Sequence, residues 1–551
     1  MIAQDGVLFV LLAVCGLSWA SLQGNIRPKT YVDLGAEDVY QFNGNDTHTD
    51  FFRLVLHDGP NLLVGGRNFL HILNLTDLTE TQRLTWFSSD SDKFMCKLKG
   101  KDEESCQNYI RVLTKISPGR YLVCGTNAFK PICREYSLQT SGFLMEKETS
   151  GQGICPYNPK SNNTAVFTNG ELYSGTFADF AEVDSLIFRQ PFRTRQFDSN
   201  TLKNPNFVSS FAHGDYVYFF FREVAIENIN DKESIYSRVA RVCKSDRGGF
   251  RYIRGCRHCW TSFLKTRLNC SVPGDLPIYF DQIQSTSDLI EGSYGGLNGQ
   301  IIYAVFTAST NSTGGSAVCA FNMQDISEAF EGTFKEERDS NWLPVDNSKV
   351  PDPRPGRCVN DSRTLPESTL SFIETHSLMA ESVKSVFRQP IVTRTSSQFV
   401  QIAVDPQVKT PEGKSHDVLF IGTDNGKIIK KAVNAESAEN PKKLDLVIIE
   451  EIQVFPPSVA IRNLKVVRDD SVAEGRLIVI SDSEIKSIKL HRCNSDKITS
   501  CSECVALQDP YCAWDNQGHK CISMKSAAQW SDNKNFLQSI ASGVHSLCQK
   551  I

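Results

Sequence analysis

The segment LLVGGRNFLHILNL, residues 62–75, contains the pattern that decides the fold. An apolar strand ends in glycine and a polar residue, and a second strand with alternating apolar residues follows after a short turn. The pattern recurs along the chain, which is typical of a repeat architecture built from β-strands. The other copies are YLVCGTNAFKPICREY (121–136), ELYSGTFADFAEVDSLIFR (171–189), DYVYFFFRE (215–223), IIYAVFTAS (301–309), DVLFIGTDNGKIIKKAV (417–433) and RLIVISDSEIKSIKL (476–490).

Seven copies between residues 50 and 490 correspond to roughly 60 residues per unit, which fits the blades of a β-propeller better than a sandwich. In four copies a glycine closes the first strand (GGR, GTN, GTF and GTD), where it permits a tight turn or a close backbone approach. The fifth and sixth copies are flanked by long gaps. Residues 317–335 in this region have apolar side chains at helical spacing, so we expect a short helix there. The sequence therefore predicts an all-β, seven-bladed propeller.

Composition narrows the class of protein. Of 551 residues, 40% are hydrophobic and 22% are charged, which excludes wholesale disorder. The net charge of -4 provides no global field to attract nucleic acid or an anionic membrane. Eighteen cysteines without metal-binding spacing indicate an oxidising compartment.

The first residues have the features of a secretory signal peptide. The apolar run VLFVLLAVCGL (7–17) is followed by Ser18, Trp19 and Ala20, as in a signal peptide spanning residues 1–20, although the run is preceded by Asp5 and no basic residue. The alternative is a buried strand or helix. No later stretch holds 18 apolar residues, so we expect a secreted protein or an ectodomain that ends before a membrane anchor. Six N-glycosylation sequons point the same way, at Asn45, Asn74, Asn162, Asn269, Asn311 and Asn360.

The character of the sequence changes after residue 490. So small a segment has too little apolar core to hold itself, and disulfides supply the constraint. We therefore expect a propeller domain over residues 21–490 and a cysteine-rich domain over residues 491–551. The fifteen pairings open to six cysteines cannot be separated by spacing alone. These cysteines are Cys493, Cys501, Cys504, Cys512, Cys521 and Cys548.

Specific motifs run through nearly the whole chain. In the propeller region they are GGRNFLHILNL, CGTNAFKPIC, CPYNP (155–159), GELYSGT, DYVYFFFRE, YSRVARVCKSDRGG (236–249), WTSFLKTRLNCS (260–271), STSDL, PDPRPGRC (351–358), THSLM (375–379) and VLFIGTDNGKI. These motifs resemble the semaphorin family. The segment CSECVALQDPYCAWD (501–515) resembles the plexin–semaphorin–integrin (PSI) module, and the chain is most similar to class 1, the invertebrate transmembrane semaphorins.

The resemblance implies a sema-type propeller followed by a PSI knot, acting as an extracellular ligand of plexin receptors in axon guidance. It implies no enzyme activity and no cofactor. One alternative is the ectodomain of a receptor with the same domain order. Another is a secreted propeller hydrolase, because an unmarked pair of carboxylates escapes motif analysis.

The resemblance also implies a set of disulfides. The long Cys243–Cys358 bridge is expected to tie distant blades together. Cys155 has no partner in this scheme and is expected to be a buried free thiol rather than an interchain bridge. The implied pairs are Cys96–Cys106, Cys124–Cys133, Cys243–Cys358, Cys270–Cys319, Cys493–Cys512, Cys501–Cys548 and Cys504–Cys521.

Cys256 and Cys259 depart from the family sequence. A zinc site would need two more ligands at close spacing, so we expect a local disulfide or a thiol pair and no bound metal. GTDNGK (422–427) is shorter than a phosphate loop, which predicts a hairpin turn.

Two basic residues are candidates for receptor binding. Lys101 lies in the loop CKLKGKDEESC, where a disulfide would reduce the entropy that is lost on binding. Arg394 follows THSLM, where the family often has a basic residue that faces plexin. A solvated surface charge is the alternative for both. Lys427, Lys430, Lys431, Lys442 and Lys443 are either a contact for sulphated glycans or a solvated face.

The expected stoichiometry rests on one position. Close relatives can carry an interchain cysteine where this chain has Asp231. We therefore expect a monomer or a weak non-covalent homodimer.

Overall fold

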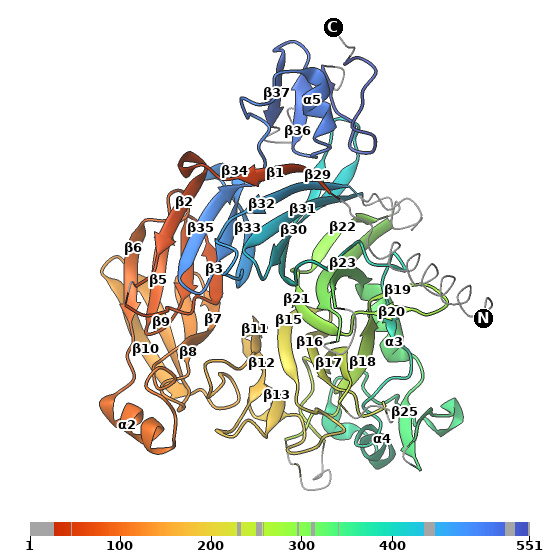
Figure 1. Ribbon diagram of the computed structural model, residues 1–551. Helices are drawn as coiled ribbons and strands as arrows, with labels where there is room; N and C mark the ends of the chain where they lie inside the picture. Colours follow the sequence, from red (N-terminus) through yellow and green to blue (C-terminus); the bar gives the residue numbers. More distant parts are fainter. Residues whose placement is uncertain are drawn as a thin grey trace, which may run out of the picture.

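The computed structural model describes residues 27–45, 47–228, 233–249, 256, 258–294, 297–309, 314–339, 341–434, 447–523 and 535–548. The predicted signal peptide and the positions Asp231, Asn311, Lys442 and Lys443 lie outside these residues. Seven sheets are arranged around a common centre, and a small module sits beyond one edge of the ring (Figure 1). The expected all-β fold is thus confirmed.

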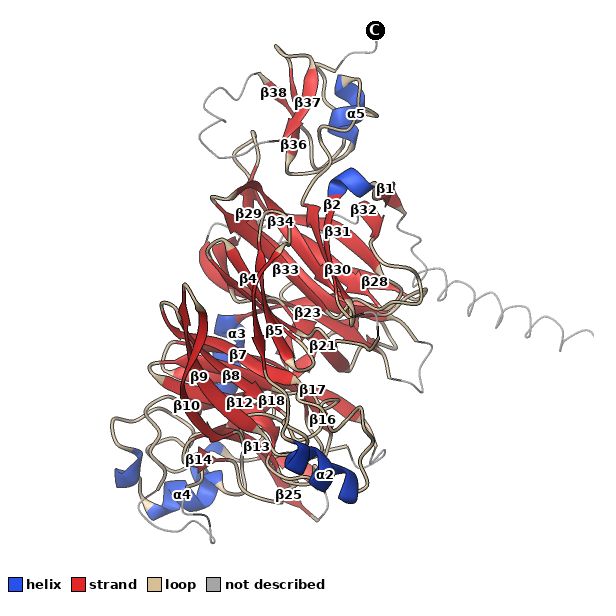
Figure 2. Cartoon of the chain, turned by 90° about the vertical axis from the view of Figure 1, so that its left-hand side faces the viewer, coloured by secondary structure: helices blue, strands red, loops and turns tan. Residues whose placement is uncertain are grey.

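Each of the seven sequence copies belongs to a different sheet, so the repeat was predicted correctly. Figure 2 shows the ring turned by 90°, with strands through most of the molecule and the C-terminal end of the chain beyond it. Blade 1 contains β3 (Leu54–Asp58), β4 (Asn61–Gly65), β5 (Phe69–Asn74) and β6 (Glu80–Thr85). Blade 2 contains β7 (Ile110–Ser117), β8 (Arg120–Gly125), β9 (Ile132–Gln139) and β10 (Gly142–Ser150). Blade 3 contains β11 (Thr164–Thr168), β12 (Glu171–Phe177), β13 (Ser185–Arg189) and β14 (Phe192–Arg193).

Blades 4, 5 and 6 have five strands each, and blade 7 has four. Blade 4 contains β15 (Asn206–His213), β16 (Tyr216–Val224), β17 (Ile235–Cys243), β18 (Leu264–Asn269) and β27 (Val383–Lys384). Blade 5 contains β21 (Gln282–Thr286), β22 (Ile290–Tyr294), β23 (Leu297–Thr307), β24 (Ser316–Asn322) and β28 (Val392–Arg394). Blade 6 contains β1 (Pro28–Asp33), β29 (Phe399–Lys409), β30 (Ser415–Thr423), β31 (Lys427–Asn434) and β32 (Ile448–Gln453). Blade 7 contains β2 (Val39–Asn43), β33 (Asn463–Asp469), β34 (Val472–Ile480) and β35 (Glu484–Lys489).

The ring is closed in two ways. The inner strands β3, β7, β11, β15, β21, β29 and β33 contact one another in an unbroken circle. At the outer edge, the N-terminal strand β2 pairs antiparallel with β35 and so completes the last blade, while β1 pairs parallel with β32. Closure of this kind leaves each sheet with only short edges.

The glycines that end the first strand of a repeat serve close packing between blades. An added Cβ at Gly175 would lie 2.6 Å from the Phe207 ring of blade 4. An added Cβ at Gly422 would lie 2.8 Å from Ile461, at the start of blade 7. Since neither glycine has a positive φ, their role is to admit the neighbouring blade rather than to form a turn. The predicted turn of GTDNGK connects β30 and β31 as a hairpin.

A 69-residue insertion separates β24 from β28 of blade 5. It contains α3 (Met323–Glu331), β25 (Lys335–Arg338), β26 (Asn341–Pro344), α4 (Glu367–Ile373) and β27. The expected helix is α3, although the first residues of the predicted segment belong to β24 instead. Asn322 caps α3 by accepting from the Gln324 amide, and the helix buries Met323, Ile326 and Phe330 in the core between blades 4 and 5.

The module after residue 490 is small. It consists of α5 (Cys501–Ala506) and a sheet of β36 (Cys512–Asp515), β37 (Lys520–Ser523) and β38 (Phe536–Leu537). Ser500 and Glu503 form a capping box at the start of α5. The apolar core of this module is continuous with that of blades 6 and 7, since Tyr511 and Trp514 belong to the same buried cluster as Phe420 and Leu477.

Candidate functional site

Eight disulfides are present in the described residues. They comprise the seven pairs implied by the family resemblance and a local Cys256–Cys259 bridge. Cys155 is free and fully buried beside the Cys124–Cys133 bridge, and burial raises the pKa of its thiol. A thiol that stays protonated is a poor nucleophile, so nothing in its surroundings supports a reactive role.

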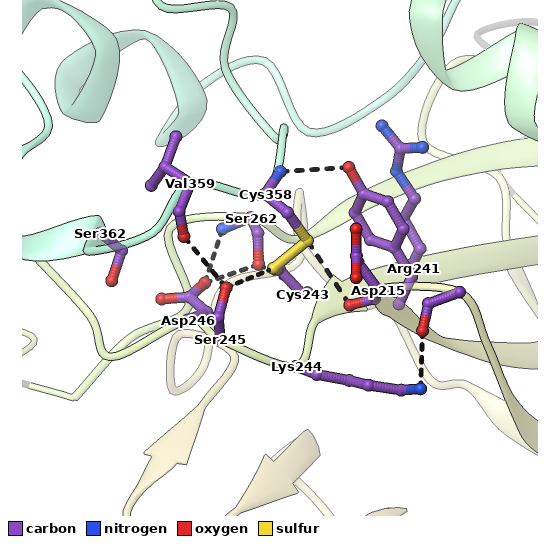
Figure 3. Close-up of a disulfide and its surroundings, with 12 residues drawn as sticks. Asp215, Arg241, Cys243, Lys244, Ser245, Asp246, Ser262, Cys358, Val359 and Ser362 are labelled. Atoms are coloured by element: carbon purple, nitrogen blue, oxygen red, sulfur yellow. Dashed lines mark hydrogen bonds between the residues drawn. A yellow bond between two sulfur atoms is a disulfide. The ribbon is translucent and has the colours of Figure 1, made fainter.

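The long Cys243–Cys358 bridge fastens the insertion of blade 5 to blade 4, so it connects neighbouring blades and the expectation of distant ones was wrong (Figure 3). Cys243 ends β17, and the Cys358 amide donates to the Tyr216 hydroxyl at 3.1 Å. The Ser245 hydroxyl donates to the Val359 carbonyl at 3.0 Å. Hydrogen bonds on both sides of the bridge therefore also connect the insertion to blade 4.

Lys101 lies in a rigid loop between blades 1 and 2. The preceding helix, α2 (Asp90–Leu98), is capped by the Ser89 side chain and tied by the Cys96–Cys106 bridge. Gly100 adopts φ 81°, which turns the chain out of the helix. The Lys101 ammonium lies 4.7 Å from the ring centres of both Phe129 and Phe180. These cation–π contacts fix its position without neutralising its charge.

Arg394 has quite different surroundings. Its guanidinium donates to Glu451 at 2.6 Å, and Lys427 donates to the same carboxylate at 2.8 Å. Burial alone would raise the pKa of Glu451, but the hydrogen bonds from Lys427 and Arg394 lower it below the usual value. Arg394 therefore connects β28 of blade 5 to β32 of blade 6, and its charge is largely satisfied within the protein.

The two candidates for receptor binding do not lie together. Lys101 follows blade 1 and precedes blade 2, whereas Arg394 belongs to blade 5. Three blades separate them in either direction around the ring. A contact confined to one edge of the propeller therefore includes at most one of them.

Among the lysines considered for glycan binding, the three that the structure describes do not form a surface cluster. The side chains of Lys430 and Lys431 are buried, which corrects the interpretation of the group as an exposed face. Lys430 is paired with Asp509 of the C-terminal module, and Lys427 is the half-buried partner of Glu451. The sequence could not show this, because β31 is buried along most of its length and the acidic partner of Lys430 comes from a second domain.

The sequons differ in accessibility. Asn45, Asn162 and Asn360 are exposed, whereas Asn74 and Asn269 are half-buried. The Asn74 side-chain oxygen accepts from both the amide and the hydroxyl of Thr76. Glycosylation at these positions stays a prediction.

A cavity of about 550 Å³ lies among the inner strands of blades 5, 6 and 7. Two of its carboxylates are paired with cations, Asp288 with Lys465 at 2.6 Å and Asp405 with Arg468, and Glu291 accepts from the Gln300 side-chain amide at 2.6 Å. Nowhere in the described ranges do three or more histidine, cysteine or acidic side chains gather as a metal site. This arrangement gives the hydrolase alternative no support.

Comparisons with known proteins agree with the architecture. The Sema domain family model matches residues 283–468 and the Plexin repeat model matches residues 492–548. The chain is 55% identical to Semaphorin-1A of Drosophila melanogaster over 98% of its own length and 61% of that protein. It is 53% identical to Semaphorin-1A of Schistocerca americana, covering 98% of this chain and 74% of that protein.

Solved structures give the same result. Drosophila Semaphorin 1a, extracellular domains 1-2, matches with a TM-score of 0.85 and 55% identity, covering 94% of this chain and 100% of that one. A structure of Drosophila Plexin A in complex with Semaphorin 1b matches with a TM-score of 0.81 and 43% identity, over 91% of this chain and 96% of that one. A plexin A4 ectodomain shares only the fold, at 15% identity and a TM-score of 0.64. Among the described residues, every helix is too short or too polar to cross a bilayer.

Proposed function

This chain belongs to the semaphorin family, class 1, and from that premise we propose that it is the receptor-binding ectodomain of a cell-surface guidance ligand that engages a plexin receptor. The observation that carries the proposal is its similarity, over 91% of the chain, to the complex of Drosophila Plexin A with Semaphorin 1b. The receptor contact is a propeller edge, and the response is repulsive axon guidance. The proposal assigns no catalytic role.

An extracellular location is part of the same proposal. The eight disulfides suit an oxidising compartment, and the exposed sequons suit the secretory route. The PSI module acts as a stalk that orients the propeller relative to a membrane. Because Asp231 replaces a cysteine that relatives use to link chains, we propose a monomer or a weak non-covalent dimer.

Surface plasmon resonance on an immobilised plexin ectodomain tests the receptor contact. We expect Lys101→Glu to reduce affinity at least tenfold, because it reverses a fixed charge that has no acidic partner in the described part of the chain. An unchanged affinity would remove Lys101 from the interface. Failure of the unmodified chain to bind any plexin ectodomain would overturn the proposed function.

Arg394 needs a matched control, because Arg394→Glu also breaks the pair with Glu451. The exchange Arg394→Glu/Glu451→Arg restores an ion pair between blades 5 and 6 while it moves the positive charge. If Arg394 contacts the receptor, the exchanged variant remains as weak as the single variant. If the arginine acts only within the protein, the exchange restores binding.

A further inference from the structure

Three arginines lie where the inner strands of blades 7, 1 and 2 begin. Arg462 immediately precedes β33, Arg53 immediately precedes β3, and Arg111 is the second residue of β7. The strand β3 contacts both β33 and β7 (Figure 1). The Asn463 side-chain amide donates to the Arg53 carbonyl at 2.8 Å, so the starts of β33 and β3 lie side by side. The three guanidinium groups therefore come from neighbouring strands.

In the described part of the chain, only one carboxylate pairs with these three cations. The Arg53 guanidinium lies 2.8 Å from one oxygen of Asp482, and the Arg462 Nε donates to the other oxygen at 2.8 Å. Neither side chain donates to any other group within the described ranges, and both are partly exposed. Most of their N–H groups are thus open to a ligand.

Arg111 is the least compensated of the three. It donates to the Asn163 side chain at 3.2 Å and to the Ser161 carbonyl at 2.7 Å, and it pairs with no carboxylate of the described residues. Burial and the charge of Arg53 lower the pKa of Arg111 to about 10, so the two guanidinium groups lie close enough to repel each other. The pairing register of β7 with β8 shifts at this position, and such irregularities redirect side chains.

The opposite ends of the same strands have no excess of charge. Lys115, near the end of β7, pairs at 2.6 Å with Asp58, the last residue of β3. Arg468, near the end of β33, pairs with Asp405. Each of these two cations has its own carboxylate, whereas the three arginines at the strand starts share one. The excess of two positive charges is therefore confined to one end of the strands.

We propose that Arg53, Arg111 and Arg462 form a binding site for a doubly charged tetrahedral oxyanion, that is, a sulfate or phosphate group. We call these three residues the arginine site. The planar guanidinium groups match the oxygens of such a group, and its two negative charges balance the excess. Half-buried cations without a counter-ion are unfavourable, and an anion supplies the missing charge. The inference goes beyond the proposed function, because it requires no receptor.

The test is isothermal titration calorimetry with sodium sulfate at constant ionic strength. N-glycans are first trimmed to one sugar, because Asn162 carries a sequon beside the partners of Arg111. We expect saturable binding that Arg111→Gln weakens at least tenfold, since it removes a charged donor. Arg462→Gln, at a more exposed position, should also weaken it. Lys115→Gln is the matched control, because it changes the same strand at the neutral end, and it should bind like the unmodified chain.

A second variant tests the charge balance by a gain of affinity, which misfolding cannot imitate. Asp482→Asn removes the internal anion that occupies Arg53 and Arg462, and it keeps an acceptor oxygen of similar position. We expect this variant to bind sulfate at least threefold more tightly. Equal or weaker binding would overturn the inference.

The class of ligand has its own arm. We expect inorganic phosphate to compete with sulfate, and acetate, which carries a single charge, to bind at least tenfold more weakly. Glucose 6-phosphate and a doubly sulphated disaccharide distinguish a sugar ester from a free ion, and preference for either source supports the site. Acetate binding as tight as that of sulfate would overturn the inference.

The outcomes are separate from those of the receptor experiment. If sulfate shows no saturable binding, or if Arg111→Gln binds it as well as the unmodified chain, the arginine site is overturned and plexin binding is untouched. If the chain binds sulfate at this site but binds no plexin ectodomain, the inference stands and the proposed function is overturned.

Discussion

The propeller and the PSI module reach stability by different routes. The propeller is closed by strand pairing between its first and last segments, and its core lies in broad apolar layers between the blades. The PSI module has one six-residue helix and three short strands in its described part, crossed by three disulfides. Because these few elements bury little apolar surface, the module is stabilised by its disulfides and by its contact with the propeller.

The junction itself is unusually rich in buried charge. Lys430 of blade 6 is fully buried, pairs with Asp509 of the PSI module and lies 4.7 Å from the Tyr511 ring centre. The Tyr511 hydroxyl in turn donates to Asp405, which also binds Arg468. Buried pairs are costly to break, because removal of one partner leaves the other charge without solvation. The comparison indicates that the PSI module depends on the propeller more than the propeller depends on it.

The largest effect should follow from breaking the junction. We expect Lys430→Met to lower the free energy of unfolding of the module by about 3–5 kcal/mol, because Asp509 stays buried without its cation. The measurement is urea denaturation followed by proteolysis of the module. Lys414→Met is the control, because its pair with Glu412 is exposed and should contribute less than about 1 kcal/mol.

A double variant separates charge from packing. Lys430→Met/Asp509→Asn removes both charges and keeps an acceptor for the Tyr511 amide. We expect it to recover most of the lost stability. If it remains as unstable as the single variant, the lysine acts through its packing and not through its charge.

Removal of a disulfide should lower the free energy of unfolding by less than the loss of Lys430, and the PSI module should be affected more than the propeller. Cys504→Ala/Cys521→Ala and Cys124→Ala/Cys133→Ala each remove a buried bridge, over separations of 17 and 9 residues. The chain-entropy model gives a loss of about 3 kcal/mol for each. We expect this loss to make the PSI module sensitive to protease, while the propeller shows only a lower melting temperature. Equal protease resistance of the two variants would contradict the comparison.

The sequence predicted those parts of the fold that depend on local burial. All seven repeats were located, because alternation along LLVGGRNFLHILNL records which side chains face a neighbouring blade. The closing strands β1 and β2 were not identified, since their side chains are mostly exposed or half-buried and their alternation is weak. Their role depends on partners more than 400 residues away in the chain.

The candidate site was less predictable, because residues far away in the sequence decide whether each basic side chain is exposed or paired with a carboxylate. Lys101 and Arg394 look alike in the sequence, but only Arg394 meets a carboxylate, Glu451, from the next blade. Lys430 appeared to be a surface residue, because Asp509 is 79 positions away. Arg53, Arg111 and Arg462 come from three different blades, so only the structure shows that they lie on neighbouring strands.

The last prediction concerns acid, and it uses one buried histidine on each side of the comparison. In the propeller, burial lowers the pKa of His71, and the hydrogen bond with Glu80 at 2.6 Å opposes this in part. At the junction, the nearest carboxylate to His491, that of Glu474, is 3.9 Å away. Burial and the charges of Lys430, Arg492 and Arg468 lower the pKa of His491 to about 3, against the opposing effect of Glu474.

A histidine whose pKa is lowered is neutral in the folded protein, and the unfolded chain binds the additional proton below pH 6.5. The contribution of His491 to stability is therefore complete above pH 6.5 and is lost as the pH falls from 6.5 towards 3. At pH 5 the loss is about 2 kcal/mol, because each pH unit corresponds to about 1.4 kcal/mol. We expect the unfolding free energy of the PSI module, measured in urea at pH 7.5 and pH 5, to fall by this amount. His491→Gln should flatten the dependence, whereas His519→Gln, at an exposed position, should leave it intact. An equal slope in all three proteins would show that His491 does not cause the sensitivity of the junction to acid.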